Sequence, residues 1–77
     1  MASVEKIIEK MRNQPNGIRF VDAEKVIQAY GYNLIRQNGS HRTYYVPETH
    51  LTLPEQNQLK SVYVKAILKI VEESEQQ

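Results

Sequence analysis

The middle of the chain changes from helical to strand periodicity, and no other feature restricts the possible folds as strongly. Residues 32–37, 41–46 and 50–53 each have the composition of a short β-strand, and the second is rich in Thr, Tyr and Val. Asn38-Gly39 is typical of a tight hairpin turn, and residues 47–49 provide a second turn. Because short turns join antiparallel neighbours, this segment predicts a three-stranded antiparallel meander.

Alternation along the second predicted strand divides its side chains between two faces. It places His41, Thr43 and Tyr45 on one face of the sheet, and Arg42, Tyr44 and Val46 on the other. Neither face is wholly apolar, as expected when one side of a sheet is left open to solvent or to a ligand.

Apolar residues recur at helical spacing on both sides of the predicted strands. The stripes fall in residues 3–13, 22–30 and 61–72, while residues 55–60 have the composition of a polar loop. The expected order of elements is therefore α-α-β-β-β-α. This order predicts an α+β fold, in which helices cover a three-stranded antiparallel sheet.

The ends of the predicted helices carry their own signals. Val21 is expected to pack on Val26 as a hydrophobic staple where the second helix begins. Gly31 is expected to end that helix in the left-handed conformation, which glycine adopts readily. The residues expected to cap the three helix N-termini are Ser3, Asp22 and Ser61.

Length and composition predict one domain over residues 1–77, with an N-terminal helix at about 3–13 and a core at about 18–73. With 77 residues, 40% of them apolar, the chain can form a single hydrophobic core. It has no Cys, which excludes disulfides and thiolate metal sites. No apolar run approaches the roughly 20 residues of a membrane span, and the first residues lack the order of a signal peptide. We therefore expect a cytoplasmic protein without a membrane segment.

The net charge of +1 hides an uneven distribution. Residues 25–71 contain six basic and two acidic residues, whereas the end of the chain is acidic. A basic central region suits an anionic partner such as nucleic acid. It is equally compatible with an ordinary solvated surface.

His41 is the residue with the clearest potential for catalysis. Histidine both takes up and releases protons near neutral pH, and His41 follows Gly39-Ser40 at the predicted turn, whose backbone amides can contact an anion. Metal-free RNA cleavage needs a base for the ribose 2′-hydroxyl, an acid for the leaving oxygen and positive charge near the phosphate. The alternative is a turn histidine that only hydrogen-bonds its neighbours. His50 is expected near the far end of the hairpin, which argues against a paired-histidine site and against a metal site.

Basic and aromatic residues near the turn could contact RNA. Arg36 and Arg42 flank the turn, and Tyr44 or Tyr45 could stack on bases. The alternatives are solvated charges and aromatic rings that pack against neighbouring strands. The lysines at and before the last helix could contact a phosphate backbone, or they could simply form the solvated side of that helix. They are Lys60, Lys65 and Lys69.

Several short motifs occur in a fixed order along residues 18–73. The motifs are Gly31-Tyr32, Arg36-Gln37-Asn38-Gly39-Ser40-His41, Tyr44 in the next strand, Leu51-Thr52-Leu53-Pro54, and Leu59-Lys60 before Val64-Lys65-Ala66-Ile67-Leu68. This ordered set resembles the HicA toxin family of small bacterial mRNA interferases. The chain departs from the usual family pattern at Arg42 and at Glu55-Gln56-Asn57.

The resemblance implies a fold like that of a double-stranded-RNA-binding domain, and a metal-independent endoribonuclease that cleaves mRNA. It implies that His41 is the catalytic residue, that no cofactor is needed, and that a HicB-type antitoxin covers the active face. On this hypothesis the residues that contact RNA are Gly39, Ser40, Arg36, Arg42, Lys60 and Lys65. A non-catalytic RNA-binding module and a module that only binds an antitoxin are the alternatives.

Overall fold

A three-stranded antiparallel sheet and three helices form the fold. The computed structural model describes residues 3–47 and 49–75. In chain order the elements are α1 (Val4–Asn13), β1 (Ile18–Arg19), α2 (Phe20–Ala29), β2 (Asn33–Asn38), β3 (His41–Val46), β4 (Thr49–Pro54), β5 (Gln58–Leu59) and α3 (Ser61–Glu75). The predicted α+β class and the order of the helices and long strands are confirmed. The short strands β1 and β5 pair with each other in a second small sheet.

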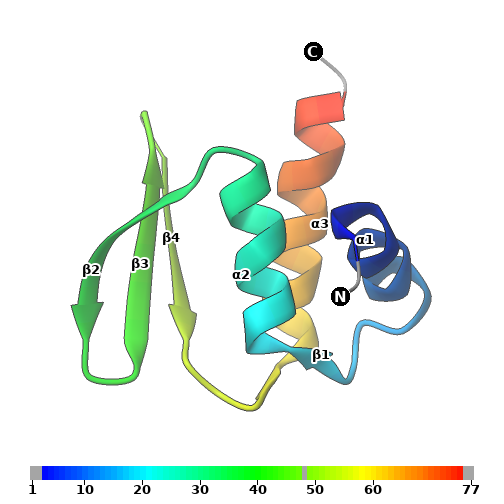
Figure 1. Ribbon diagram of the computed structural model, residues 1–77, viewed down its shortest axis with the longest axis horizontal. Helices are drawn as coiled ribbons and strands as arrows, with labels where there is room; N and C mark the ends of the chain where they lie inside the picture. Colours follow the sequence, from blue (N-terminus) through cyan, green and yellow to red (C-terminus); the bar gives the residue numbers. More distant parts are fainter. Residues whose placement is uncertain (1–2, 48, 76–77) are drawn as a thin grey trace.

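The helices lie together on one side of the sheet formed by β2, β3 and β4. Figure 1 shows α2 next to this sheet, with α3 and α1 beyond it. Side chains from every layer join one core, in which Met11 of α1, Val26 of α2, Ile67 of α3 and Tyr44 of β3 are fully buried. Among the described residues, no helix is long and apolar enough to cross a membrane. In the described part of the chain, no helix lies over the other face of the sheet (Figure 1).

The helix ends confirm two of the five predicted signals and contradict the other three. Ser3 caps α1, because its Oγ accepts a hydrogen bond from the backbone amide of Lys6 at 3.3 Å. Gly31 follows α2 with φ +91°, in the left-handed region where a side chain would be strained. The prediction that Ser61 caps the last helix is wrong. Ser61 is the first residue of α3, and the carbonyl of Lys60 accepts the first backbone bonds of the helix.

The second helix begins earlier than the sequence predicts. Pairing of β1 with β5 holds the chain extended as far as Arg19, and α2 starts immediately afterwards at Phe20. Asp22 is therefore not the cap but lies in the first turn, where its carboxylate accepts a hydrogen bond from Arg19 Nε at 3.3 Å. Val21 is 59% exposed, so the predicted staple on Val26 is also wrong.

The sequence predicted a polar loop over residues 55–60, but this segment includes a short strand. Gln58 and Leu59 form β5, and Leu59 is only 2% exposed. A single apolar residue among polar ones has no periodicity, so the sequence alone gave no sign of this strand. The strand carries the residues before it towards the start of α2, where the amide of Phe20 donates to the carbonyl of Asn57 at 3.4 Å.

Candidate active site

The turn between β2 and β3 presents His41 at the first position of a strand. Asn38 pairs with His41, so Gly39-Ser40 forms the turn, one residue later than predicted. Gly39 has φ +62°, the left-handed conformation that tight hairpin turns require. The side chain of His41 is exposed.

The sheet register confirms the two predicted faces of β3. His41 lies opposite Pro54, Thr43 opposite Thr52, and Tyr45 opposite His50. Because directly paired residues point to the same side of a sheet, these residues share one face. We call it the open face, since the helices lie on the other side (Figure 1). On the helix side of the same strand, Tyr44 is fully buried.

Arg36 belongs to the open face, whereas Arg42 does not. Arg36 is paired with Thr43 and is exposed, so it lies on the same side as His41. Arg42 alternates to the helix side of β3, and 22% of its side chain is exposed. Lys60 and Lys65 lie just before and within α3, which belongs to the helix side of the sheet (Figure 1). The structure thus groups Gly39, Ser40 and Arg36 with His41, and it places the other predicted RNA contacts elsewhere.

Arg42 is held by two carboxylates that the sequence did not connect with it. Its Nη1 lies 3.0 Å from Glu24 Oε2, and its Nη2 lies 3.0 Å from Glu55 Oε2. The guanidinium also lies over the ring of Phe20, 5.2 Å from its centroid, at a distance typical of a cation–π contact. The hydrogen bond to Glu24 raises the pKa of Arg42, and the charge of Glu55 raises it further. Arg42 therefore links β3 to α2 and to the segment after β4.

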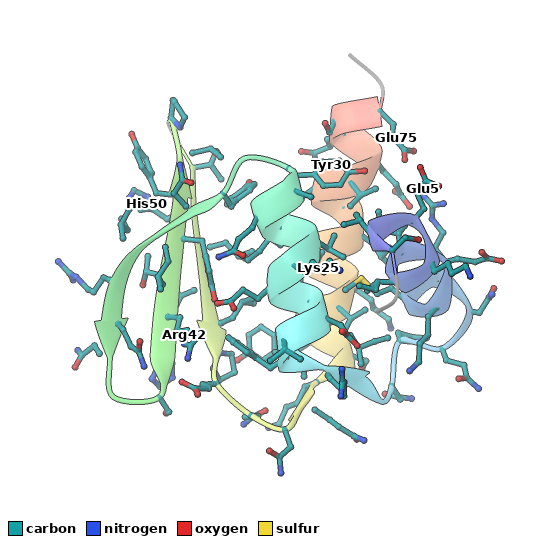
Figure 2. All side chains as sticks on the ribbon, in the orientation of Figure 1. Glu5, Lys25, Tyr30, Arg42, His50 and Glu75 are labelled. Carbon is teal, nitrogen blue, oxygen red and sulfur yellow. The ribbon has the colours of Figure 1, made fainter. Side chains whose placement is uncertain are left out.

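Tyr44 completes this cluster from within the core. Its hydroxyl donates a hydrogen bond to Glu24 Oε2, the same oxygen that pairs with Arg42. Burial raises the pKa of the Tyr44 hydroxyl, and the bond to Glu24 raises it further. The hydroxyl therefore remains a donor throughout the neutral range. Figure 2 shows Arg42 near the turn end of the sheet and His50 near the opposite end.

Glu55 joins this cluster to the turn that carries His41. Its backbone amide donates to the carbonyl of Ser40 at 2.5 Å. Its carboxylate accepts hydrogen bonds from Arg42 Nε at 3.2 Å and from Gln37 Nε2 at 3.4 Å. One residue thus contacts the strand before the turn, the turn itself and the strand after it. We refer to this arrangement as the Glu55 clamp.

An open cleft of about 720 Å³ borders the turn. One wall is Gly39-Ser40, another is the start of α2, and the third is the segment between β4 and β5. Its lining residues are Arg19, Phe20, Val21, Gly39, Ser40, Glu55, Gln56 and Asn57. The sequence did not indicate this cleft, because it depends on the pairing of β1 with β5. Among residues 3–47 and 49–75, no group of three or more His, Asp or Glu side chains is arranged to hold a metal ion.

A family model described as the HicA toxin of bacterial toxin–antitoxin systems matches residues 21–72. The chain belongs to the HicA toxin family. The match confirms the resemblance seen in the motifs, and it spans α2 except its first residue, the whole β2-β3-β4 sheet and most of α3. Helix α1 and strand β1 lie outside the matched HicA region. No curated protein and no solved structure matches the chain. Membership supports a role as the toxin of a toxin–antitoxin pair, and it implies an antitoxin partner.

Removing the carboxylate of Glu55 is expected to loosen the turn between β2 and β3 without unfolding the domain. In Glu55→Ala, Gln37 and Arg42 each lose an acceptor, while Arg42 keeps its bond to Glu24. A hydrogen bond contributes about 0.5 to 1.5 kcal/mol, so we expect amide hydrogen exchange at Ser40 and His41 to become roughly 3- to 10-fold faster. Gln56→Ala, one residue further along the same segment, is the matched control. Equal acceleration in both variants would assign the effect to the segment as a whole and not to the clamp.

Proposed function

We propose that this HicA-family chain is an endoribonuclease that cleaves mRNA without a metal ion, with His41 as its general base or general acid. The observation that carries the proposal is the position of His41. It is exposed at the first residue of β3, beside a turn that forms one wall of an open cleft. Its imidazole is free to approach a bound ribose or phosphate, as proton transfer requires.

The chemistry of this site follows from the groups around the turn. The ribose 2′-oxygen attacks the adjacent phosphorus as it loses its proton, and the bond to the 5′-oxygen of the next nucleotide breaks. His41 accepts the first proton or supplies the one that the leaving oxygen takes up. The Ser40 hydroxyl and the turn amides supply hydrogen bonds for the non-bridging phosphate oxygens. The products are a 2′,3′-cyclic phosphate and a free 5′-hydroxyl.

The predicted RNA contacts take different parts in this proposal. Arg36 shares the open face with His41 and supplies positive charge for the phosphates near the cleaved bond. Arg42 is engaged by Glu24 and Glu55, so we assign it an indirect part, in which it holds the turn in place. Lys60 and Lys65 are exposed and would contact RNA further from the turn.

A HicB-type antitoxin is the proposed partner. The toxin–antitoxin family implies an antitoxin, and the open face around His41 is the surface that an inhibitor of cleavage has to cover. Covering this face would exclude RNA from the turn without changing the fold.

The proposal is tested by incubating the purified chain with an mRNA and with short single-stranded RNAs in the presence of EDTA. We expect fragments with 2′,3′-cyclic phosphate ends, and growth arrest when the chain is produced in bacteria. RNA binding without cleavage at any pH from about 5 to 9 would identify a non-catalytic RNA-binding module. Co-purification with an antitoxin, without cleavage or growth arrest in its absence, would identify an antitoxin-binding module.

A further inference from the structure

We propose that Tyr45 and His50 form a base-stacking platform for single-stranded RNA on the open face. The inference rests on the RNA-cleaving function proposed above, and it adds a binding subsite at some distance from the reacting phosphate. Tyr45 and His50 are direct cross-strand partners of β3 and β4. Their ring centroids lie 5.0 Å apart, and the ring planes are tilted by 30°.

Both rings are accessible where an incoming base could reach them. Tyr45 is 36% exposed, and His50 is exposed as well. They lie on the open face, because Tyr45 alternates with the buried Tyr44 along β3 and His50 is its direct partner. Exposed aromatic rings on an open sheet are the usual means by which proteins hold unpaired bases, because every base has a π-face.

The charge of the open face favours an anionic partner such as RNA over a basic or neutral one. The cationic and titratable side chains that share this face are Arg36, His41 and His50. The other described residues that pair across it are Asn, Thr, Tyr and Pro, and none is a carboxylate. Glu55, the nearest described acidic residue along β4, directs its carboxylate towards Arg42 on the helix side. RNA passing over this face meets no described negative charge.

The spacing along β3 determines which nucleotide the platform can hold. Tyr45 is four residues from His41 on the same face, which corresponds to about 13 Å at about 3.3 Å per residue. Thr43 and Thr52 lie between them, with their Oγ1 atoms 3.2 Å apart, and offer hydroxyls to the backbone of a strand that crosses. A base stacked on Tyr45 and His50 is therefore not at the cleaved bond. The platform would select substrates with an unpaired segment on one side of that bond.

The test measures RNA affinity separately from cleavage. In a His41→Ala background, a fluorescein-labelled single-stranded RNA of ten nucleotides is titrated with protein, and its fluorescence anisotropy gives Kd. We expect Tyr45→Ala to raise Kd by about 10-fold, within the range found when a ring that stacks on a base is removed. Tyr45→Phe and His50→Phe keep a ring and should retain the affinity. Tyr63→Ala, which removes a ring from α3, is the control on the helix side, and thermal unfolding checks that each variant is folded.

Cleavage assays of the same substitutions with His41 present separate the two proposals. If the platform holds RNA, Tyr45→Ala raises KM and leaves kcat nearly unchanged, because a remote binding contact is lost. Cleavage with unchanged KM and unchanged Kd in Tyr45→Ala would overturn the platform, leave the ribonuclease intact and assign the ring pair to packing or to a protein partner. A similar loss of RNA affinity in His50→Phe and His50→Ala would show that His50 acts through its charge and not through stacking, which also overturns the platform. An absence of cleavage with Tyr45-dependent binding would overturn the ribonuclease and support the platform.

Discussion

Replacing His41 by alanine is expected to lower the rate of RNA cleavage by about 10²- to 10⁴-fold, the usual contribution of a positioned general acid or base. The exposed imidazole lies at the start of β3, outside the hydrophobic core, so its loss should change the free energy of unfolding by no more than about 0.5 kcal/mol. The measurement is single-turnover cleavage of an end-labelled RNA at saturating protein, together with urea unfolding. A large change in rate with little change in stability would assign a chemical role to His41.

His50→Ala is the matched control for this experiment. His50 is the same type of residue, is exposed and lies on the same face, but it pairs with Tyr45 at the other end of β3. At saturating protein its loss should leave the single-turnover rate within a few-fold of the parent, because His50 is proposed to bind RNA and does not reach the reacting phosphate. If His41→Ala cleaves RNA as fast as the parent chain, the catalytic assignment is wrong. If both variants lose activity equally, the chemistry is not specific to the turn.

Replacing Tyr44 by alanine is expected to produce the largest loss of stability among the substitutions considered. The Tyr44 ring is fully buried between the sheet and the helices, and its hydroxyl donates to Glu24. Truncating a large buried aromatic side chain costs about 3 to 5 kcal/mol. A domain of this size has a total stability of only about 4 to 12 kcal/mol, so Tyr44→Ala should lose roughly a quarter or more of its free energy of unfolding. Urea unfolding followed by circular dichroism measures the difference.

Tyr44→Phe separates the ring from the hydroxyl. It keeps the packing but removes the donor to Glu24, at an expected cost of about 1.5 to 3 kcal/mol, as for other hydrogen bonds to a charged group. Burial raises the pKa of the Tyr44 hydroxyl in the folded state, and the hydrogen bond to Glu24 raises it further. Stability from this group is therefore fully present below about pH 10, the ordinary tyrosine value, and is lost as the pH rises above it. The alkaline loss should be smaller in Tyr44→Phe. An equal loss in both proteins would exclude Tyr44 as its source.

The sequence predicted the sheet and its faces because both depend on local signals. The three strands differ in period from the helices around them, and the hairpin sequence fixes which residues of β3 share a side. The sequence alone could therefore place His41 next to a turn, with its side chain on the opposite face of the sheet from that of Arg42. The motifs around it also identified the family that the match over residues 21–72 confirms.

What the sequence could not predict are contacts between distant segments. The start of α2 is determined by pairing of Arg19 with Gln58, and no local signal near Asp22 reports that pairing. Arg42 was predicted to contact RNA, yet its carboxylate partners lie 18 residues before it and 13 residues after it. The charges of Glu24 and Glu55 are visible in the sequence, but their positions relative to β3 depend on the packing of α2 against the sheet.

The segment from Glu55 to Asn57 has a mechanical consequence for the cleft. Its first amide bonds to the carbonyl of Ser40, and its last carbonyl accepts from the amide of Phe20, so it ties two opposite walls together through main-chain bonds. These two bonds therefore fix the width of the cleft before any ligand binds. A partner that widened the cleft would have to break at least one of these two main-chain bonds. Slow hydrogen exchange at the amides of Phe20 and Glu55, with and without an inhibitor, would report that rigidity.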